Sequence, residues 1–321
     1  MGVTGTGTDM DEQDGGDRMN VGFIGLGNIG KPMALCVVNA GHRTTVHDIR
    51  RAAATDLLEA GATWAETPAE VARACDVVMG SLPGPLEVEA VVNGEQGVLD
   101  GAAAGSVYID LATNSPSMVR KLHAICAERG VEYIDAPVSK GSGSDSADRG
   151  VLTVMAGGDP DTLERVMPVL EAIGDPELIY HCGPVGAGAT VKLCNNLVAH
   201  TTFSVVAEAL TIGLKAGVEL ETLATVMAAG SASSPKLPRY EAVFDRNFEP
   251  AGHAFVRSDA KDVRLATELA REVDVPADIA AAVDQKYVAA VAAGIGHLGG
   301  SAIVQVQEER ARVVLGRGSG G

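Results

Sequence analysis

The sequence predicts an α/β fold in which a doubly wound, mostly parallel sheet is followed by an all-helical C-terminal domain, the two joined by a long helix. Three observations predict this fold. Short apolar runs alternate with helical stretches from Asn20 to about Cys182, as in successive βαβ units. A glycine-rich turn directly follows the first apolar run. Beyond Gly183 the strand patterns stop, and alanine-rich helical sequence takes over.

The alternating region consists of short elements with recognisable ends. Gly41, Gly61 and Gly130 each follow a helical stretch, at the position where a left-handed residue ends a helix. The expected strands are 21–24, 44–47, 77–81, 107–110, 133–136, 152–156 and 178–181, and the expected helices are 29–39, 52–59, 68–74, 117–128 and 161–172. In the second half we expect a long helix from about 188 to 215 and shorter helices at 220–229, 255–273, 279–293 and 303–307, with a loop at 231–238.

Composition divides the chain into four parts. Residues 1–19 are rich in glycine and aspartate and lack the apolar stretch of a secretory signal, so we expect a disordered extension. Residues 20–183 form the α/β domain and residues 184–315 the helical domain. Residues 316–321 are mostly glycine and are expected to be a flexible tail.

The charge and hydropathy of the chain exclude several classes of partner. Its 321 residues carry a formal net charge of −17, which argues against nucleic acids and anionic membranes. The longest apolar region, 191–217, is interrupted by polar side chains that include Lys192 and Glu208. We therefore expect a buried helix there rather than a membrane span.

The cysteines and the acidic residues indicate neither a disulfide framework nor a metal site. Five cysteines are scattered along the chain without a CxxC pair, as expected for thiols in a reducing compartment, and we therefore expect a cytoplasmic protein. No group of histidine, aspartate and glutamate has the spacing of metal ligands, so we expect no metal.

The first strand leads into Gly25-Leu26-Gly27-Asn28-Ile29-Gly30, a G-x-G-x-x-G turn that opens a helix. Gly25 allows the tight turn, Gly27 lets a pyrophosphate approach the backbone, and Gly30 lets the helix pack against the strand. Free amides at the helix start attract the phosphates. This strand–turn–helix context predicts a Rossmann-like NAD(P)-binding domain.

Asp48 indicates which dinucleotide binds. It ends the second strand about 20 residues beyond the glycines, where a carboxylate would bind the ribose hydroxyls of NAD. The same carboxylate would repel the 2′-phosphate of NADP. We therefore expect NAD, with NADP as the alternative because Arg50 and Arg51 follow closely and offer a phosphate site.

Five motifs occur in a fixed order between Asn20 and about Arg312. They are the fingerprint 23–30 with Met33-Ala34 and Gly41-His42, then Asp110-Leu111-Ala112-Thr113-Asn114-Ser115-Pro116, Asp135-Ala136-Pro137-Val138-Ser139-Lys140-Gly141, Gly186-Ala187-Gly188 leading to Lys192-Leu193-Cys194-Asn195-Asn196, and Lys261-Asp262-Val263-Arg264-Leu265-Ala266. In this order they resemble the β-hydroxyacid dehydrogenase family, which contains 3-hydroxyisobutyrate dehydrogenases and tartronate semialdehyde reductases.

Lys192 is the expected catalytic residue. It lies in an otherwise apolar helix, where burial favours the neutral amine that a general base needs. Asn196 follows four residues later and therefore lies on the same helix face, where it can hold the substrate hydroxyl or carboxylate. The resemblance implies the same two roles. His200, two turns after Lys192, is expected to be a core or interface residue.

Further substrate contacts are expected from the second and third motifs. Ser139 and the backbone of Gly141 follow a strand and can bind a carboxylate. The family has glycine where this chain has Lys140, which either adds a charge to the carboxylate pocket or points into solvent. Thr113 can contact the substrate or the nicotinamide ribose, although the family's preceding serine is Ala112 here.

The remaining cofactor contacts come from both domains. Leu82 and Pro83 resemble the family's loop near the adenosine side of the cofactor. The resemblance also implies that Lys261 reaches across the cleft toward the cofactor, whereas Asp262 anchors its helix or a lysine.

We therefore expect an enzyme that transfers a hydride reversibly between NAD(P) and a small 3-hydroxy acid, with the active site between the two domains. The helical domain and the resemblance indicate a homodimer or homotetramer. Three alternatives are weighed. An imine reductase usually carries aspartate or tyrosine in place of Lys192, a 6-phosphogluconate-type enzyme needs a larger helical domain, and a non-catalytic NAD-binding protein would not need the Lys192–Asn196 pair.

Overall fold

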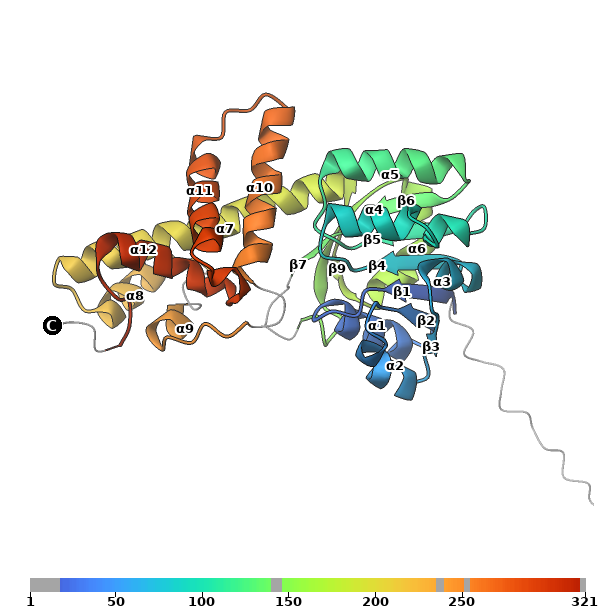
Figure 1. Cartoon of the computed structure of the whole chain (residues 1–321), viewed down its shortest axis with the longest axis horizontal. Coiled ribbons are helices and arrows are strands. Elements are labelled where there is room, and N and C mark those ends of the chain that lie inside the picture. Colours follow the sequence, from blue (N-terminus) through green and yellow to red (C-terminus); the bar gives the residue numbers. More distant parts are fainter. Residues whose placement is uncertain (1–17, 140–145, 235–239, 251–254, 318–321) are drawn as a thin grey trace, which may run out of the picture.

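The computed structural model describes residues 18–139, 146–234, 240–250 and 255–317. Figure 1 shows two parts, a sheet flanked by helices and a cluster of helices, with the long helix α7 running from one into the other. The predicted α/β fold with an all-helical C-terminal domain is confirmed.

The sheet has the order β3-β2-β1-β4-β5-β6-β8-β7, and β9 pairs with β8. The strands are β1 (Asn20–Ile24), β2 (Arg43–His47), β3 (Thr63–Trp64), β4 (Val77–Gly80), β5 (Val107–Asp110), β6 (Glu132–Asp135), β7 (Val138–Ser139), β8 (Leu152–Gly157) and β9 (Gly174–Gly183). Pairing is parallel from β3 through β6 and between β8 and β9, whereas β8 runs antiparallel to β6 and β7. The strand order reverses between β1 and β4, which is the switch point where dinucleotides bind in such sheets.

Helices cover both faces of this sheet. They are α1 (Gly30–Asn39), α2 (Thr55–Glu59), α3 (Pro68–Ala74), α4 (Pro85–Asn93), α5 (Pro116–Glu128) and α6 (Pro160–Glu171). Because side chains alternate along a strand, Val77 and Met79 of β4 pack with α1, α2 and α6 while Val78 packs with α3, α4 and α5. The nearly continuous apolar runs of the sequence are therefore strands buried on both faces.

Three of these helices begin in the same way. Thr67, Ser115 and Asp159 each accept a hydrogen bond from the backbone amide three residues later, and each is followed by proline. A polar N-cap followed by proline starts a helix at a defined residue. This local chemistry explains why α3, α5 and α6 begin within one residue of the predicted positions.

Some elements differ from the prediction. Strands β3 and β7 have two residues each, too few for a periodic pattern, and helix α4 was not predicted although Pro85 opens it. The predicted helix 52–59 is a 3₁₀ turn (Arg51–Ala54) followed by α2. The predicted strand 178–181 is the central part of the longer β9.

The second domain consists of α7 (Ala187–Lys215), α8 (Leu220–Ala229), α9 (Tyr240–Phe244), α10 (Val256–Glu272), α11 (Asp278–Ala292) and α12 (Val304–Ala311). Its core surrounds α7, where the rings of Phe203 and Tyr240 stack with centroids 4.6 Å apart. By length and composition α7 could cross a membrane, but a helix in the interior of a soluble protein passes the same test.

Both ends of the described chain are attached to the fold. Met19, at the end of the predicted extension, pairs with β2 through its carbonyl, which accepts from the Arg43 amide at 3.0 Å. Arg317, in the predicted tail, forms ion pairs with Glu221, Glu241 and Asp245. Residues 1–17 and 318–321 lie outside the described part of the chain.

Helix α7 starts in close contact with the sheet. A Cβ atom on Gly188 would lie 2.1 Å from the Met155 carbonyl oxygen, and one on Gly157 would lie 2.8 Å from the Gly188 amide. The Asp135 carboxylate accepts hydrogen bonds from Gly186 N at 2.8 Å and from Ala189 N at 2.7 Å. These contacts fix where α7 leaves the α/β domain.

Gly188→Ala is expected to lower stability by about 1–3 kcal/mol, because the added methyl group would push α7 away from β8. Thermal unfolding of the variant and the parent, followed by circular dichroism, measures the loss. Gly296→Ala is the control, since the atom nearest to its Cβ would lie 3.4 Å away in the Arg257 side chain, which is an ordinary contact. Equal melting temperatures for all three proteins would contradict the close packing inferred at Gly188.

Candidate active site

The candidate site lies along the carboxyl ends of β1, β2, β4, β5 and β6, where the sheet meets the helical domain. Each of these strands is followed by a segment predicted to bind cofactor or substrate. They are Gly25–Gly30 after β1, Asp48 after β2, Leu82-Pro83 after β4, Thr113 after β5 and Ser139 in β7 after β6. Parallel strands thus bring together residues that are far apart in sequence.

The glycine turn has the geometry that a phosphate loop requires. Gly25 has φ +92°, and a Cβ there would lie 2.2 Å from the Ser81 carbonyl oxygen. A Cβ on Gly30 would lie 1.9 Å from the Gly25 oxygen, so the helix and the turn contact each other directly. Gly27 has no atom within 4 Å of its Cβ position, which leaves open space beside the start of α1. The three glycines therefore fit a dinucleotide pyrophosphate.

Asp48 lies beside this turn. One of its carboxylate oxygens accepts from Leu26 N at 2.8 Å, and the other accepts from Arg50 N at 2.8 Å. A hollow of about 610 Å³ adjoins the turn and is lined by Leu26, Gly27, Asn28, Lys31, Pro32, Arg50, Ala52 and Ala53. This hollow is large enough for the adenosine end of a dinucleotide.

Arg50 and Arg51, the possible site for the 2′-phosphate of NADP, differ from each other in position. Arg50 lines the hollow, and its Nε lies 3.7 Å from the Asp48 carboxylate. Arg51 is engaged elsewhere, because it forms an ion pair with Glu66 at 2.7 Å and lies 5.3 Å from the centre of the Trp64 ring.

The loop after β5 is fixed by a buried carboxylate. Asp110 accepts hydrogen bonds from Ala112 N at 3.0 Å, from Asn114 Nδ2 at 3.0 Å and from the Tyr133 hydroxyl at 2.8 Å. Burial raises the pKa of Asp110, whereas these three hydrogen bonds act in the opposite direction. Thr113 lies between two of the donors, so its position is set by Asp110.

Lys192 and Asn196 lie on the buried face of α7, one turn apart. The Asn196 amide donates to the Asp262 carboxylate at 2.7 Å, which joins α7 to α10. Asp262 is also 3.0 Å from the Lys261 ammonium, close enough for an ion pair although not aligned as a hydrogen bond. His200 is buried, as predicted for a core residue, and lies 3.8 Å from Asp259.

Lys261 crosses from the helical domain to the α/β domain. Its ammonium donates to the Thr113 carbonyl at 2.9 Å. Its side chain also lies against the loop after β4, since a Cβ on Gly84 would be 3.2 Å from the Lys261 Cδ. A chain of contacts therefore runs from Asn196 through Asp262 and Lys261 to the loop that carries Thr113.

Two of the predicted substrate-binding residues are not among the residues that the structure describes. Ser139 is half-buried in β7, and Lys140 and Gly141 lie outside the described residues. Among the described residues, no group of three or more histidine, cysteine, aspartate or glutamate side chains is arranged to hold a metal ion.

Two positioning carboxylates were not singled out from the sequence. Asp110 and Asp135 are both strand-final and fully or almost fully buried. In the sequence, each is an aspartate at the end of an apolar strand. This pattern could have identified them, because a buried carboxylate needs hydrogen-bond donors around it. Their partners lie up to 54 residues away and depend on the fold.

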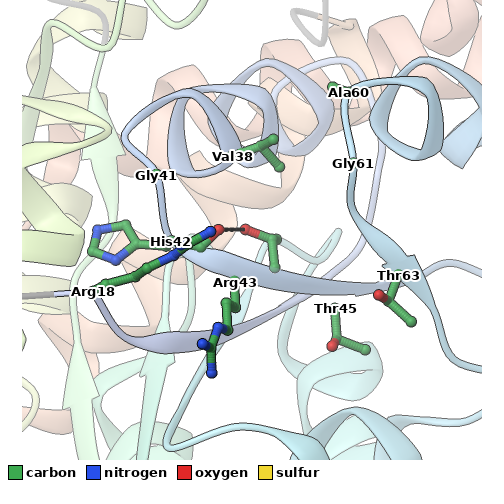
Figure 2. Close-up of a pocket in the computed structure, with 10 residues that line it drawn as sticks. Arg18, Val38, Gly41, His42, Arg43, Thr45, Ala60, Gly61 and Thr63 are labelled. Atoms are coloured by element: carbon green, nitrogen blue, oxygen red, sulfur yellow. Dashed lines mark hydrogen bonds between the residues drawn. The ribbon is translucent and has the colours of Figure 1, made fainter. Parts of the chain in front are cut away.

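A second hollow, of about 380 Å³, lies at the amino ends of the strands and is lined by Arg18, Val38, Gly41, His42, Arg43, Thr44, Thr45, Ala60, Gly61 and Thr63. Figure 2 shows Arg43 and Thr45 projecting from one face of β2, whereas Val38 lies over the other face. These side chains do not converge on one point, and the hollow is at the edge opposite the glycine turn. We therefore place the active site at the carboxyl edge.

Comparison with known proteins agrees with this geometry. Residues 20–186 match the family model described as the NAD binding domain of 6-phosphogluconate dehydrogenase, and residues 186–307 match the one described as the NAD-binding domain of NADP-dependent 3-hydroxyisobutyrate dehydrogenase. The chain belongs to the β-hydroxyacid dehydrogenase family. The boundary between the two matches falls at Gly186, where α7 begins.

Relatives within the family are named as enzymes that act on hydroxy or oxo acids. The chain is 36% identical to a 2-(hydroxymethyl)glutarate dehydrogenase of Eubacterium barkeri, over 94% of this chain and 98% of that protein. It is 33% identical to the 2-hydroxy-3-oxopropionate reductase of Escherichia coli K12, over 90% and 97%. The structure is similar to a 3-hydroxyisobutyrate dehydrogenase of Mycobacterium tuberculosis solved with L-serine, with a TM-score of 0.80, 29% identity and coverage of 90% and 99%.

This β-hydroxyacid dehydrogenase is therefore an enzyme that binds NAD(P) and oxidises or forms a small hydroxy acid. The names of these three relatives, all of which act on hydroxy or oxo acids, do not support the imine reductase and non-catalytic alternatives. The model matched by residues 20–186 is named for 6-phosphogluconate dehydrogenase, but the helical half matches the model named for 3-hydroxyisobutyrate dehydrogenase.

Asp135 is expected to make stability depend on pH. Burial raises its pKa from 3.8 to about 7, against the two backbone hydrogen bonds that favour the carboxylate. Between about pH 4 and pH 7 the folded chain holds a proton that the unfolded chain has lost. The free energy of unfolding should therefore fall as pH rises through this window, by on the order of 4 kcal/mol from this group.

Asp135→Asn should remove that part of the pH dependence. Urea unfolding of the parent and the variant between pH 5 and pH 8 measures it, with the exposed Asp161→Asn as the charge-matched control. A stability difference between parent and Asp135→Asn that is the same at every pH would rule out titration of Asp135 in this range.

Proposed function

We propose that this β-hydroxyacid dehydrogenase oxidises the primary alcohol of an acid of the form HOCH₂–CHR–COO⁻ to the semialdehyde, with Lys192 as general base. The observation that carries the proposal is the pairing of Lys192 with Asn196 on the buried face of α7, one turn apart. The relatives' names support the substrate class, because 2-(hydroxymethyl)glutarate, 3-hydroxyisobutyrate and L-serine all carry a CH₂OH group next to the carbon that bears the carboxylate.

In this mechanism each residue has a separate task. The neutral Lys192 amine takes the hydroxyl proton during oxidation and returns it during reduction. Asn196 holds the substrate beside the amine, and its own orientation is fixed by Asp262 at 2.7 Å. Ser139 with the backbone of Gly141, and Lys140 beside them, would receive the carboxylate. The bound nicotinamide supplies the hydride acceptor.

The residues expected to hold the cofactor come from both domains. The Gly25–Gly30 turn would hold the pyrophosphate, and Asp48 the adenosine ribose. Leu82 and Pro83 would lie along the adenosine side of the cofactor and Thr113 beside the nicotinamide ribose, with Lys261 reaching from α10 to both loops. NAD is favoured over NADP because Asp48 is beside the glycine turn and Arg51 is paired with Glu66.

We also propose the cellular location, the class of partner and the oligomeric state of the enzyme. Cytoplasmic localisation is supported by the five cysteines, all of which are free thiols. The net charge of −17 supports small-molecule partners rather than nucleic acid or membrane. The apolar side chains exposed on the helical domain support a homodimer or homotetramer.

Lys192→Ala should lower turnover of 3-hydroxy acids by about two orders of magnitude or more, because the amine that is proposed to take the hydroxyl proton is removed. NADH formation, followed by absorbance on a panel of these acids, measures turnover, and NADH fluorescence checks that the cofactor still binds. Lys215→Ala, at the exposed end of the same helix, is the control. A Lys192→Ala enzyme as active as the parent would disprove the mechanism without affecting the fold.

Asp48→Ser should weaken NAD binding roughly tenfold or more and reduce discrimination against NADP, because a charged hydrogen bond is lost and repulsion of the 2′-phosphate is removed. The ratio of kcat/KM for the two cofactors is the measurement, with the exposed Glu59→Ala as control. General damage to the glycine turn would weaken both cofactors equally, so an unchanged ratio would count against the proposed role of Asp48.

A further inference from the structure

Helices α7 and α10 contact each other through both apolar and polar side chains. In Figure 1 α10 runs across α7 rather than alongside it, so their contact is local. Leu193 of α7 packs there against Leu265 and Ala266 of α10. Apolar packing has no preferred direction, so these side chains hold the two helices together without fixing the angle between them.

Two polar contacts join the same pair of helices. The first is the hydrogen bond from Asn196 to Asp262. The second lies one turn farther along α7, where His200 Nδ1 is 3.8 Å from the Asp259 carboxylate, close enough for an ion pair when the imidazole is protonated. His200 follows Asn196 by four residues and Asp259 precedes Asp262 by three, so each helix presents its two polar groups on one face. We call the contact between His200 and Asp259 the rung.

Stability alone does not account for a polar pair in this place. The side chains of His200 and Asp259 are only 11% and 13% exposed, and the His200 ring meets the buried ring of Tyr287 of α11 edge-on, with centroids 5.8 Å apart. Removing such groups from water costs free energy, and apolar side chains of similar size often stabilise a core as well or better. The rung therefore points to a role in orienting the helices rather than in holding them together.

Two directional contacts fix an angle that a single contact leaves free. With the hydrogen bond from Asn196 to Asp262 alone, α10 could turn about that bond. The rung lies about 6 Å farther along α7 and opposes such a rotation. The angle matters because Lys261 of α10 donates to the Thr113 carbonyl at 2.9 Å, on the loop after β5. A rotation of α10 would therefore disturb the contacts to Asn196 and to Thr113 together.

We infer that His200 and Asp259 are positioning residues for the proposed reaction. By fixing the angle of α10 against α7, they set where Asp262 and Lys261 lie relative to Lys192. The inference rests on the proposed function, because it takes Lys192 as the group that the other side chains must face.

The test separates turnover from cofactor binding. His200→Leu and Asp259→Asn should each lower kcat by about tenfold on the best acid of the panel, because small displacements of reacting groups are costly. The dissociation constant for NADH, measured by its fluorescence, should stay within about twofold of the parent's, because the glycine turn and Asp48 belong to the sheet. A merely structural role would lower the melting temperature and leave the kcat of the folded enzyme unchanged.

Glu208→Leu is the matched control. Glu208 also joins α7 to another helix, because it forms an ion pair with Lys286 of α11. It lies about 12 Å beyond His200 along α7, so its loss should lower stability while changing kcat by less than about twofold.

A double variant shows whether the two residues act as one rung. Adding Asp259→Asn to His200→Leu should then lower kcat no further, whereas independent residues would multiply their losses to about a hundredfold. Losses that multiply would overturn the inference, as would folded single variants with the parent's kcat or a loss of NADH affinity as large as the loss of kcat. If the leucine variant does not fold, the kcat of Asp259→Asn, which keeps the size of the side chain, decides alone.

Failure of the rung and failure of the base can be told apart. Unimpaired rung variants beside an inactive Lys192→Ala enzyme would overturn the role of His200 and Asp259 alone. Impaired rung variants beside an active Lys192→Ala enzyme would overturn the assignment of the base, and with it the group that the rung is inferred to serve.

Discussion

The attachment of α7 to the sheet is the contact on which the rest of the molecule depends. The Asp135 carboxylate ends β6 and accepts from Gly186 N and Ala189 N, while Gly188 lets the helix approach the Met155 carbonyl. Lys192 follows Ala189 by less than one turn. A small rotation at this attachment would therefore move the amine relative to every loop at the carboxyl edge.

Buried carboxylates fix neighbouring groups at three places around the site. Asp110, Asp135 and Asp262 are buried carboxylates whose oxygens hold a loop, a helix start and an amide side chain. Burying a carboxylate is unfavourable unless donors surround it, so each one fixes the groups that donate to it. In this way residues separated by up to 66 positions hold one arrangement.

Much of the fold follows from local chemistry, and that is why the sequence predicts it. Apolar strands, polar N-caps before proline and the G-x-G-x-x-G turn are read within a few residues, and they place β1, α1 and α5 correctly. Helix α4 begins with Pro85 but has Gly84 instead of a polar N-cap, and the two-residue β3 and β7 are too short for a periodic pattern. Asp262 was predicted to anchor its helix or a lysine, and it lies beside Lys261. Its contact with Asn196 and the contacts of Asp135 could not be predicted, because these partners come together only in the folded chain. The apolar helix, the four-residue spacing and the resemblance together indicated Lys192 and Asn196.

Helix α7 also limits where this chain can change in length without losing its site or its core. Each residue turns a helix by about 100°, so a single insertion would rotate everything beyond it by that angle. An insertion between Gly188 and Lys192 would carry the lysine away from the cleft. One between Asn196 and Phe203 would leave the lysine in place but turn Phe203 and Leu210 out of the core. The orientation of α7 is therefore more sensitive to an insertion or deletion than to a substitution on its exposed face.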